Sequence, residues 1–230
     1  MKAYSLKDLT RQIQKIVGTT QDGIWGPATA NAVLAKLQGG KKVEPTVNKP
    51  STAVKRIAID IGHATGTGAR GNGHEEHAAC EVIASSLRRQ LMNALPDYKI
   101  EIIDFPEMDN KGDLSATGKA LKNNKYTLCV SLHCDCADSP TAKGAHVCYN
   151  EAIDKPLAEE IAEYLCDLLP GRSQRLVQRT GLHVLNASDE PHVLAECGFI
   201  SNPGDAKIIH EFPDKIAEAI TKGIVNYINL

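Results

Sequence analysis

Three apolar segments of the sequence each lead into a residue that can bind a metal ion or move a proton. The segment IAIDIG is followed by His63, TLCVSL by His133, and HVLA by Glu196. The composition of each segment is typical of a buried strand. A carboxylate such as Glu196 is costly to bury unless it is paired, protonated or close to a cation. If the three strands are parallel neighbours, their carboxyl ends meet at one edge of a sheet, and we expect these side chains to gather there.

A fourth candidate, Glu76, follows the glycine-rich loop in the segment GTGARGNGHEEHAAC. Steps of four and three residues from Glu76 reach the apolar face of the predicted helix, formed by Cys80, Ile83, Leu87 and Leu91. We therefore expect Glu76 to begin the buried stripe and to point across the loop toward His63. Glu75 has a weaker stripe and is the less favoured candidate, and His77 is expected on the solvent face.

Two histidines and one glutamate are a donor set of catalytic zinc sites, in which the fourth position stays open for water. Zinc lowers the pKa of that water toward about 7 and polarises a bound carbonyl. A further carboxylate that is not a ligand accepts the proton and passes it to a leaving amine, a role that suits Glu196. In the alternative interpretation, Glu196 caps a helix or pairs with a lysine and both histidines are core residues. Spacing alone leaves both interpretations open.

The segments around these residues alternate between strand and helix patterns from residue 55 onward. Strands are expected at 56–61, 98–104, 127–133, 145–150, 182–185 and 192–196, and helices at about 75–93, 114–123, 153–169 and 213–228. The alternation predicts an α/β fold with a mostly parallel, mixed sheet of about six strands and helices on both faces.

The N-terminal residues 1–38 read as a small all-α module. An apolar stripe predicts its first helix (Leu9, Ile13, Ile16 and Val17), the turn cluster TTQDGIWGP follows, and a second helix is expected at about 28–37. Residues 39–54 are rich in Gly, Pro, Lys and Thr without periodicity, which is typical of a linker. The sequence thus predicts a module at 1–38, a linker at 39–54 and a catalytic domain at 55–230.

Composition narrows the class of protein. The 230 residues are 42% hydrophobic and 23% charged, as in soluble globular proteins. A net charge of −2 and 4% aromatic residues give no support to nucleic-acid binding. No apolar run is long enough to span a membrane. The N-terminus shows no apolar core of a secretory signal, so we expect cytoplasmic synthesis followed by release or non-classical export.

The cysteines indicate reduced thiols. Their number, seven, is odd, and their spacing fits no disulfide framework. Cys134 and Cys136 in HCDC are a weak zinc signal because no second pair accompanies them. We expect core thiols.

The motifs together resemble a known enzyme family. IAIDIGHATGTGARGNGHEE, VSLHCDC followed by KGAHVCYN, and VLAECGFISNPGD resemble the zinc-dependent N-acetylmuramoyl-L-alanine amidases of the amidase-3 family. The resemblance implies Zn²⁺ ligands at His63, Glu76 and His133 and a catalytic carboxylate at Glu196. It also implies that the substrate is peptidoglycan, cut at the amide between the lactyl group of the glycan and the L-Ala of the stem peptide.

Four positions depart from the family pattern or stay open. Ala64 and Thr65 follow His63 where a glycine pair is frequent, and His146 stands where many members carry Glu. His192 opens the strand of Glu196. His146 and His192 are either supporting or substrate-contacting residues or, as we favour, ordinary core or surface histidines.

The segment LTRQIQKIVGTTQDGIWGPATANAVLAKLQ is similar to the peptidoglycan-binding-domain-1 fold, which implies a wall-targeting role for residues 1–38. We interpret the chain as a two-part cell-wall hydrolase of the phage or prophage endolysin type. The alternatives are a zinc peptidase that cuts within the stem peptide and a non-catalytic wall-binding protein. The module could equally cover the catalytic groove. The sequence carries no signal for an oligomeric state.

Overall fold

The structure is a computed structural model that describes residues 6–18, 29, 32–33, 36 and 54–230. The chain divides into two compact units, one formed by Met1–Thr52 with Asn229–Leu230 and the other by Ala53–Ile228. In the described part of the chain, no helix is long and apolar enough to cross a membrane.

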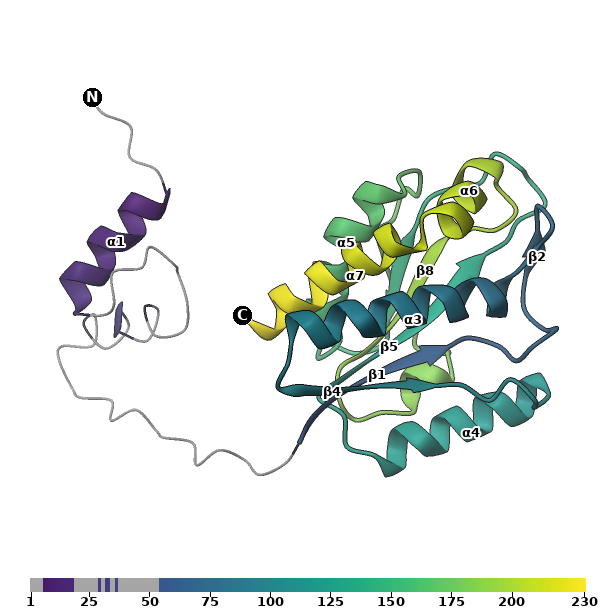
Figure 1. The fold of residues 1–230 in the computed structure, drawn as a ribbon, viewed down its shortest axis with the longest axis horizontal. Helices are drawn as coiled ribbons and strands as arrows, with labels where there is room; N and C mark the ends of the chain where they lie inside the picture. The colour runs from purple at the N-terminus through teal and green to yellow at the C-terminus, as the bar shows by residue number, and fades with distance from the viewer. Residues whose placement is uncertain (1–5, 19–28, 30–31, 34–35, 37–53) are drawn as a thin grey trace. The chain divides into compact units, whose positions relative to one another are not determined.

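The larger unit is built on a six-stranded sheet in the order β4-β1-β5-β8-β6-β7 (Figure 1). Its strands are β1 (Lys55–Ile61), β4 (Tyr98–Ile103), β5 (Leu128–Asp135), β6 (His146–Tyr149), β7 (Leu176–Gln178) and β8 (His192–Phe199). All neighbouring strands are parallel except β6 and β8, which are antiparallel. A separate hairpin pairs β2 (Arg70–Gly71) with β3 (His74–Glu75). The predicted mixed, mostly parallel sheet is confirmed.

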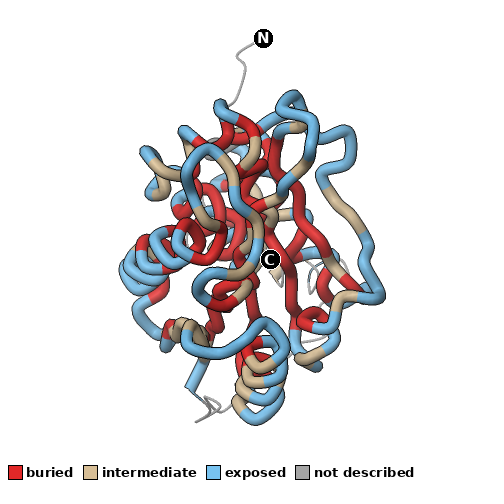
Figure 2. The backbone as a smooth tube through the Cα atoms, turned by 90° about the vertical axis from the view of Figure 1, so that its right-hand side faces the viewer, coloured by how far each residue is buried: buried red, intermediate tan, exposed pale blue. Residues whose placement is uncertain are grey.

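Helices cover both faces of the sheet, as predicted. On one face lie α3 (Glu76–Ala94), α5 (Lys155–Leu168) and α7 (Pro213–Ile228), and on the other lie α4 (Asn110–Asn123) and the short 3₁₀ helix η1 (Val184–Asn186) (Figure 1). The helix α6 (Pro203–Glu211) packs against β8 and α7. Figure 2 shows the buried residues along the central strands and the inner sides of the helices.

Strand alternation divides the core in two. On β1, Ile57, Ile59 and Ile61 belong to the larger apolar cluster beneath α3, α5 and α7, while Ala58 belongs to a smaller cluster with residues of α4 and η1. Successive side chains of a strand point to opposite faces. Asp60, two residues after Ala58, therefore lies on the side of α4. The alternation therefore determines which residues of each central strand lie on the α4 side and which lie beneath α3, α5 and α7.

Some predicted elements are wrong or incomplete. The strand expected at 182–185 is absent: Val184 and Leu185 pack into the smaller core from η1, and the edge position next to β6 is taken by β7, which was not predicted. Short apolar runs do not distinguish a strand from other buried segments. The helix expected at 114–123 begins at Asn110, because the Asp109 carboxylate caps it by accepting from Gly112 N–H at 2.7 Å. The helix α6 was also missed.

The smaller unit contains α1 (Leu6–Val17). Two members of its predicted apolar stripe are exposed, Leu9 by 43% and Ile16 by 65%, whereas Thr10 and Gln14 are buried. Gln14 Nε2 donates to Thr29 Oγ1 at 3.0 Å. Of the second predicted helix, at 28–37, only residues 29, 32, 33 and 36 are described, and they are helical. The rest of it and the linker up to residue 53 lie outside the described residues.

Candidate active site

The carboxyl ends of three adjacent parallel strands meet at one edge of the sheet. His63 follows β1 by two residues, and His133 and Glu196 lie within β5 and β8 as direct register partners. The chain after β1 is tied to β5, because Gly62 N–H donates to the carbonyl of Leu132 at 3.0 Å. The topology therefore brings together the three residues that end the apolar segments of the sequence.

The first residue of α3, Glu76, lies between the two histidines. Its Oε1 accepts from His133 Nδ1 at 3.0 Å, and its Oε2 is 3.3 Å from His63 Nε2. One ligand atom from each of the three residues lies within 4.8 Å of the others, and they form the one such cluster found among the described residues. Glu75 instead faces the loop, where Gly66 N–H donates to its carboxylate.

Backbone amides hold the Glu76 carboxylate in place. Ala69 N–H donates to Oε2 at 2.7 Å and Cys134 N–H donates to Oε1 at 3.0 Å. Burial alone raises the pKa of Glu76, but the hydrogen bond and positive charge of His133, together with these two amides, lower it below its ordinary value. The carboxylate is therefore ionised and fixed in direction, although its side chain is only 3% exposed.

The His63 and His133 rings are positioned by local backbone features. His63 has a φ of +66°, an unusual left-handed conformation for a residue other than glycine. A Cβ at Gly62 would lie 2.2 Å from Cε1 of the His133 ring, so only glycine permits this ring position. Burial lowers the pKa of His133, but its hydrogen bond to Glu76 and the charges of Glu196 and Glu76 raise it to about 9.

Asn110 completes the cluster and was missed by the sequence analysis. Its Oδ1 lies 3.1 Å from His63 Nδ1 and also accepts from Thr67 Oγ1 at 3.2 Å. An oxygen that only accepts requires the proton on Nδ1 of His63, which leaves Nε2 free to act as a metal ligand. The signal in the sequence was the cap residue Asp109, which places Asn110 in the first turn of α4.

The donor set fits a divalent cation of the zinc type. Two imidazole nitrogens and a carboxylate oxygen are ligands that zinc takes in catalytic sites. Ligand atoms bound tetrahedrally at about 2.0–2.2 Å lie roughly 3.3–3.6 Å from one another. The 3.3 Å between Glu76 Oε2 and His63 Nε2 is of this size. The three residues can thus hold the metal that the sequence interpretation implies.

Glu196 lies beside the cluster. It pairs in register with His133 on β5 and with His146 on β6, and its Oε2 is buried without a hydrogen-bond partner among the described residues. Burial is the main cause that raises the pKa of Glu196 to about 7. A carboxyl group with a pKa near neutrality both accepts and donates a proton at physiological pH.

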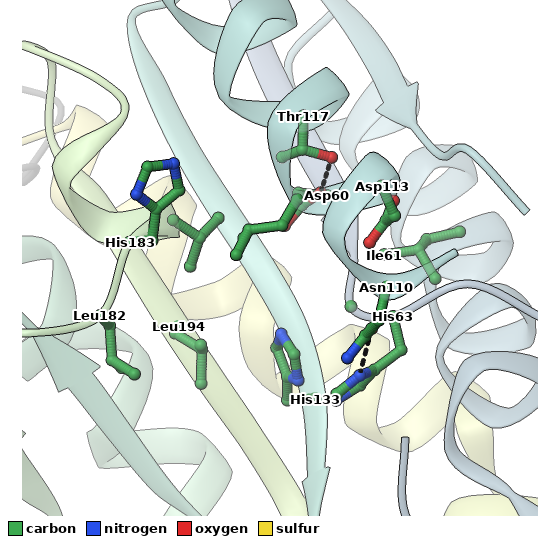
Figure 3. Close-up of a pocket in the computed structure, with 13 residues that line it drawn as sticks. Asp60, Ile61, His63, Asn110, Asp113, Thr117, His133, Leu182, His183 and Leu194 are labelled. Carbon is green, nitrogen blue, oxygen red and sulfur yellow. Dashed lines mark hydrogen bonds between the residues drawn. The ribbon is translucent and has the colours of Figure 1, made fainter. Parts of the chain in front are cut away.

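A pocket of about 180 Å³ opens next to the two histidines on the α4 side of the sheet (Figure 3). Its polar lining includes Asp60, Asn110 and Asp113, and its apolar walls are Leu114, Leu182, Val184 and Leu194. Figure 3 shows His63 and His133 at one end of this pocket and the hydrogen bond between Asp60 and Thr117 at the other. The pocket offers a small group bound at the histidines a partly apolar environment.

Two further histidines, His192 and His77, are buried in different surroundings. His192 is fully buried at the start of β8, where its Nε2 lies 2.9 Å from Ser131 Oγ, and Ser131 in turn donates to Asp60 at 2.6 Å. Burial lowers the pKa of His192 to about 3. The expectation that His77 faces solvent is wrong, because its buried ring contacts Asp104 at 3.0 Å beyond the end of β4.

The cysteines form no disulfide. All seven lie in the described part of the chain and are free, and only Cys136 is exposed. Cys134 lies on the face beneath α3, in the larger apolar core, while His133 lies on the opposite face.

Comparison with known proteins finds one family. The amidase-3 family, described as N-acetylmuramoyl-L-alanine amidase, matches residues 57–226. The N-acetylmuramoyl-L-alanine amidase LytC of Bacillus subtilis is 32% identical over 180 residues, which cover 74% of this chain and 35% of LytC. The chain therefore spans about a third of the length of this relative.

Solved structures show the same fold. The catalytic domain of CwlV, an N-acetylmuramoyl-L-alanine amidase from Bacillus (Paenibacillus) polymyxa, superposes with a TM-score of 0.67 and 23% identity over 76% of this chain and 98% of that domain. The catalytic domain of the CD27L endolysin, which targets Clostridia difficile, gives a TM-score of 0.68 with 23% identity over 75% of this chain and 97% of that domain.

Proposed function

The chain belongs to the amidase-3 family of N-acetylmuramoyl-L-alanine amidases, and we propose that it hydrolyses peptidoglycan at the amide between the lactyl group of N-acetylmuramic acid and the L-Ala of the stem peptide. The observation that carries the proposal is the cluster of His63, Glu76 and His133 with Glu196 on the adjoining strand. These are the four positions at which the sequence resembles the family's metal ligands and catalytic carboxylate.

Zn²⁺ is the ion that His63, Glu76 and His133 would hold. When bound, it lowers the pKa of a water molecule and polarises the scissile carbonyl. Support comes from the donor set, from the 4.8 Å cluster, and from Asn110, which directs Nε2 of His63 toward Glu76.

The proton transfers fall to Glu196. As general base it takes a proton from the attacking water, and as general acid it delivers that proton to the nitrogen of the departing L-Ala. The carboxyl group must therefore lie beside both the attacked carbon and the leaving nitrogen. Its register position next to His133 supports this role.

The proposed role of Glu196 also indicates how the substrate lies in the site. Because Glu196 serves the leaving nitrogen, the stem peptide lies on the side of β8 and β6, and the acyl half lies toward the pocket at His63 and Asn110. The pocket walls formed by Leu114, Leu182 and Leu194 suit the apolar parts of a lactyl or acetamido group.

Digestion of purified peptidoglycan with and without a zinc chelator tests the function. The expected result is chelator-sensitive release of stem peptides with free N-terminal L-Ala. New amino groups from inside the stem would instead identify a peptidase. No new chain ends in several wall chemotypes, from a protein shown to contain zinc, would favour a non-catalytic wall-binding protein.

A wall-binding role for residues 1–38 and a linker role for residues 39–54 complete the proposal. Support comes from the resemblance of the DGIWGPAT segment to peptidoglycan-binding modules and from the boundary between compact units at residues 52 and 53. Sedimentation with insoluble peptidoglycan, comparing an inactive full chain with residues 53–230, tests it. Equal sedimentation of the two would contradict a targeting role.

An endolysin role belongs to the same proposal, since the CD27L catalytic domain shares this fold. Expression together with a membrane-permeabilising protein is expected to lyse the host cell from within. Unchanged turbidity despite activity on purified wall would contradict the role.

A further inference from the structure

A second polar cluster lies next to Glu196, around its neighbour on β6. It consists of Asp135 at the end of β5, His146 on β6 and Arg172 in the segment between α5 and β7. His146 is the antiparallel register partner of Glu196, and His133 is its parallel partner. Side chains directly opposite each other in an antiparallel pair share a face with Cβ atoms about 5 Å apart. Glu196 is therefore flanked by one histidine on each side.

Arg172 determines which nitrogen of His146 carries the proton. Its Nη2 lies 3.3 Å from His146 Nε2. Because a guanidinium group can only donate, Nε2 must accept, and the neutral ring then carries its hydrogen on Nδ1. Arg172 is itself held at the edge of the cluster, 3.4 Å from Asp135 Oδ2 and over the ring of Phe199 at 5.2 Å.

The Nδ1–H group lies beside two carboxylate oxygens that accept no hydrogen bond from the described residues. His146 is 2% exposed, and Asp135 Oδ2 is 3.3 Å from its Nδ1 but outside hydrogen-bonding geometry. Seven buried side-chain polar atoms of the described residues have no hydrogen-bond partner, and three of them are Asp135 Oδ2, His146 Nδ1 and Glu196 Oε2. One donor and two acceptors that lack a hydrogen bond among the described residues thus lie on one face of adjacent strands. Buried polar atoms are costly unless satisfied, so these three require one another or a shared water molecule.

We propose that His146 is a positioning residue that orients the carboxylate of Glu196 through its Nδ1–H group, directly or through one water molecule. The buried Oε2 of Glu196 is held by this donor, and its other oxygen is left for the reacting water. Arg172 keeps His146 in the required tautomer, and Asp135 is the second acceptor beside the ring. The inference rests on the proposed role of Glu196.

Two amide variants separate positioning from space filling. In His146→Asn the side-chain nitrogen can occupy the place of Nδ1, whereas in His146→Gln it reaches the place of Nε2. We expect His146→Asn to keep kcat within about threefold of the wild type and His146→Gln to lose about 10- to 100-fold in kcat, with KM unchanged in both. Zinc content and Tm, measured on the same samples, should be similar for the two variants. Equal kcat values for both, high or low, would overturn the inference.

The arginine offers a matched control. Arg172→Met should lower kcat, whereas Arg175→Met should not, because Arg175 is exposed and its ion pair is with the exposed Asp167, at 2.6 Å. Equal effects of the two substitutions would contradict the tautomer argument.

The tautomer of His146 can also be measured directly, without an activity assay. Nitrogen-15 NMR of histidine-labelled full-length protein should show His146 protonated on Nδ1, with a mixture of tautomers after Arg172→Met. A proton on Nε2 in the wild type would overturn the inference whatever the activity. Failure of the wild type to release L-Ala ends would overturn the proposed function, while an active wild type with indistinguishable Asn and Gln variants would overturn only the role of His146.

Discussion

The two faces of the sheet are made by alternate residues of the same strands, but they bury different chemistry. Toward α3, α5 and α7, β5 presents Leu128, Val130 and Leu132. Toward α4 and η1 the same strand presents Cys129, Ser131 and His133, and β8 presents His192, Leu194 and Glu196. The first face is an apolar core, and the second carries a chain of polar groups that ends at the candidate active site.

The two faces therefore contribute to different properties of the protein, the first to stability and the second to chemistry. The apolar face supplies the free energy that holds the strands parallel and in register. On the polar face, Asp60, Thr117, Ser131 and His192 hydrogen-bond one another below the site. Substitutions of the apolar residues on the first face should therefore change the free energy of unfolding, and those of the polar residues on the second face should change activity, metal affinity or pH dependence.

Replacing Glu196 by Gln should have the largest effect on activity. The amide cannot take a proton, so kcat should fall by about 10³-fold, within the range of 10²–10⁴ ascribed to general acid–base groups. Zinc content and Tm should stay close to those of the wild type. A variant with full activity would remove Glu196 from the mechanism.

The opposite behaviour is expected on the apolar face. Leu87→Ala removes a fully buried side chain of α3 and should lower the free energy of unfolding by about 2–5 kcal/mol, measured by urea denaturation, with kcat little changed below the transition. The matched control is Val82→Ala on the same helix, where the side chain is 54% exposed and the change should stay within about 0.5 kcal/mol. Similar losses at both positions would contradict the assignment of the buried face.

Gly62→Ala should weaken metal binding rather than folding. A Cβ 2.2 Å from the His133 ring forces that ring to move, and misplaced ligands typically cost about 10- to 100-fold in metal affinity. Competition with a fluorescent zinc chelator measures this loss. Unchanged affinity would show that the ring position is not required for the metal.

The smallest predicted effect concerns pH. The pKa of His192 is about 3 in the fold, below its unfolded value of about 6.5, so the unfolded chain binds more protons in this interval. The contribution of His192 to the free energy of unfolding is complete above about pH 6.5 and declines as pH falls, by about 2 kcal/mol at pH 5. In His192→Gln this decline should disappear, because the amide still donates to Ser131 but does not titrate. Denaturant titrations at pH 7 and pH 5 with chelator present compare the two proteins, and parallel pH dependence would contradict the prediction.

Much of the fold followed from local patterns. The apolar segments before His63, His133 and Glu196 predicted β1, β5 and β8, because parallel strands buried on both faces are apolar along their whole length. The segment 182–185 (LHVL) was predicted wrongly because a short, mostly apolar segment fits a strand and a buried 3₁₀ turn equally. In the structure, the edge position next to β6 is occupied by β7 instead.

The residues of the candidate site were likewise predicted only in part. Glu76 was preferred over Glu75 from helix periodicity, and the structure places it between the two histidines. Asn110 and Arg172 were missed, because each contacts a residue of the site that lies far from it in sequence. His77 was assigned to solvent because periodicity describes one helix and not the strand end that covers its first turn.

The sequence by itself determined the chemical types, their order and, in β1, β5, β8 and the apolar stripe of α3, the side that they occupy, since these depend on periodicities of 2.0 and 3.6 residues. The tertiary structure alone decided the strand order β4-β1-β5-β8-β6-β7, which makes His133 and His146 the two neighbours of Glu196. It also decided which polar atoms are satisfied. The physical reason is that register, burial and hydrogen bonding between distant strands depend on packing of the whole sheet, to which no single segment contributes a local signal.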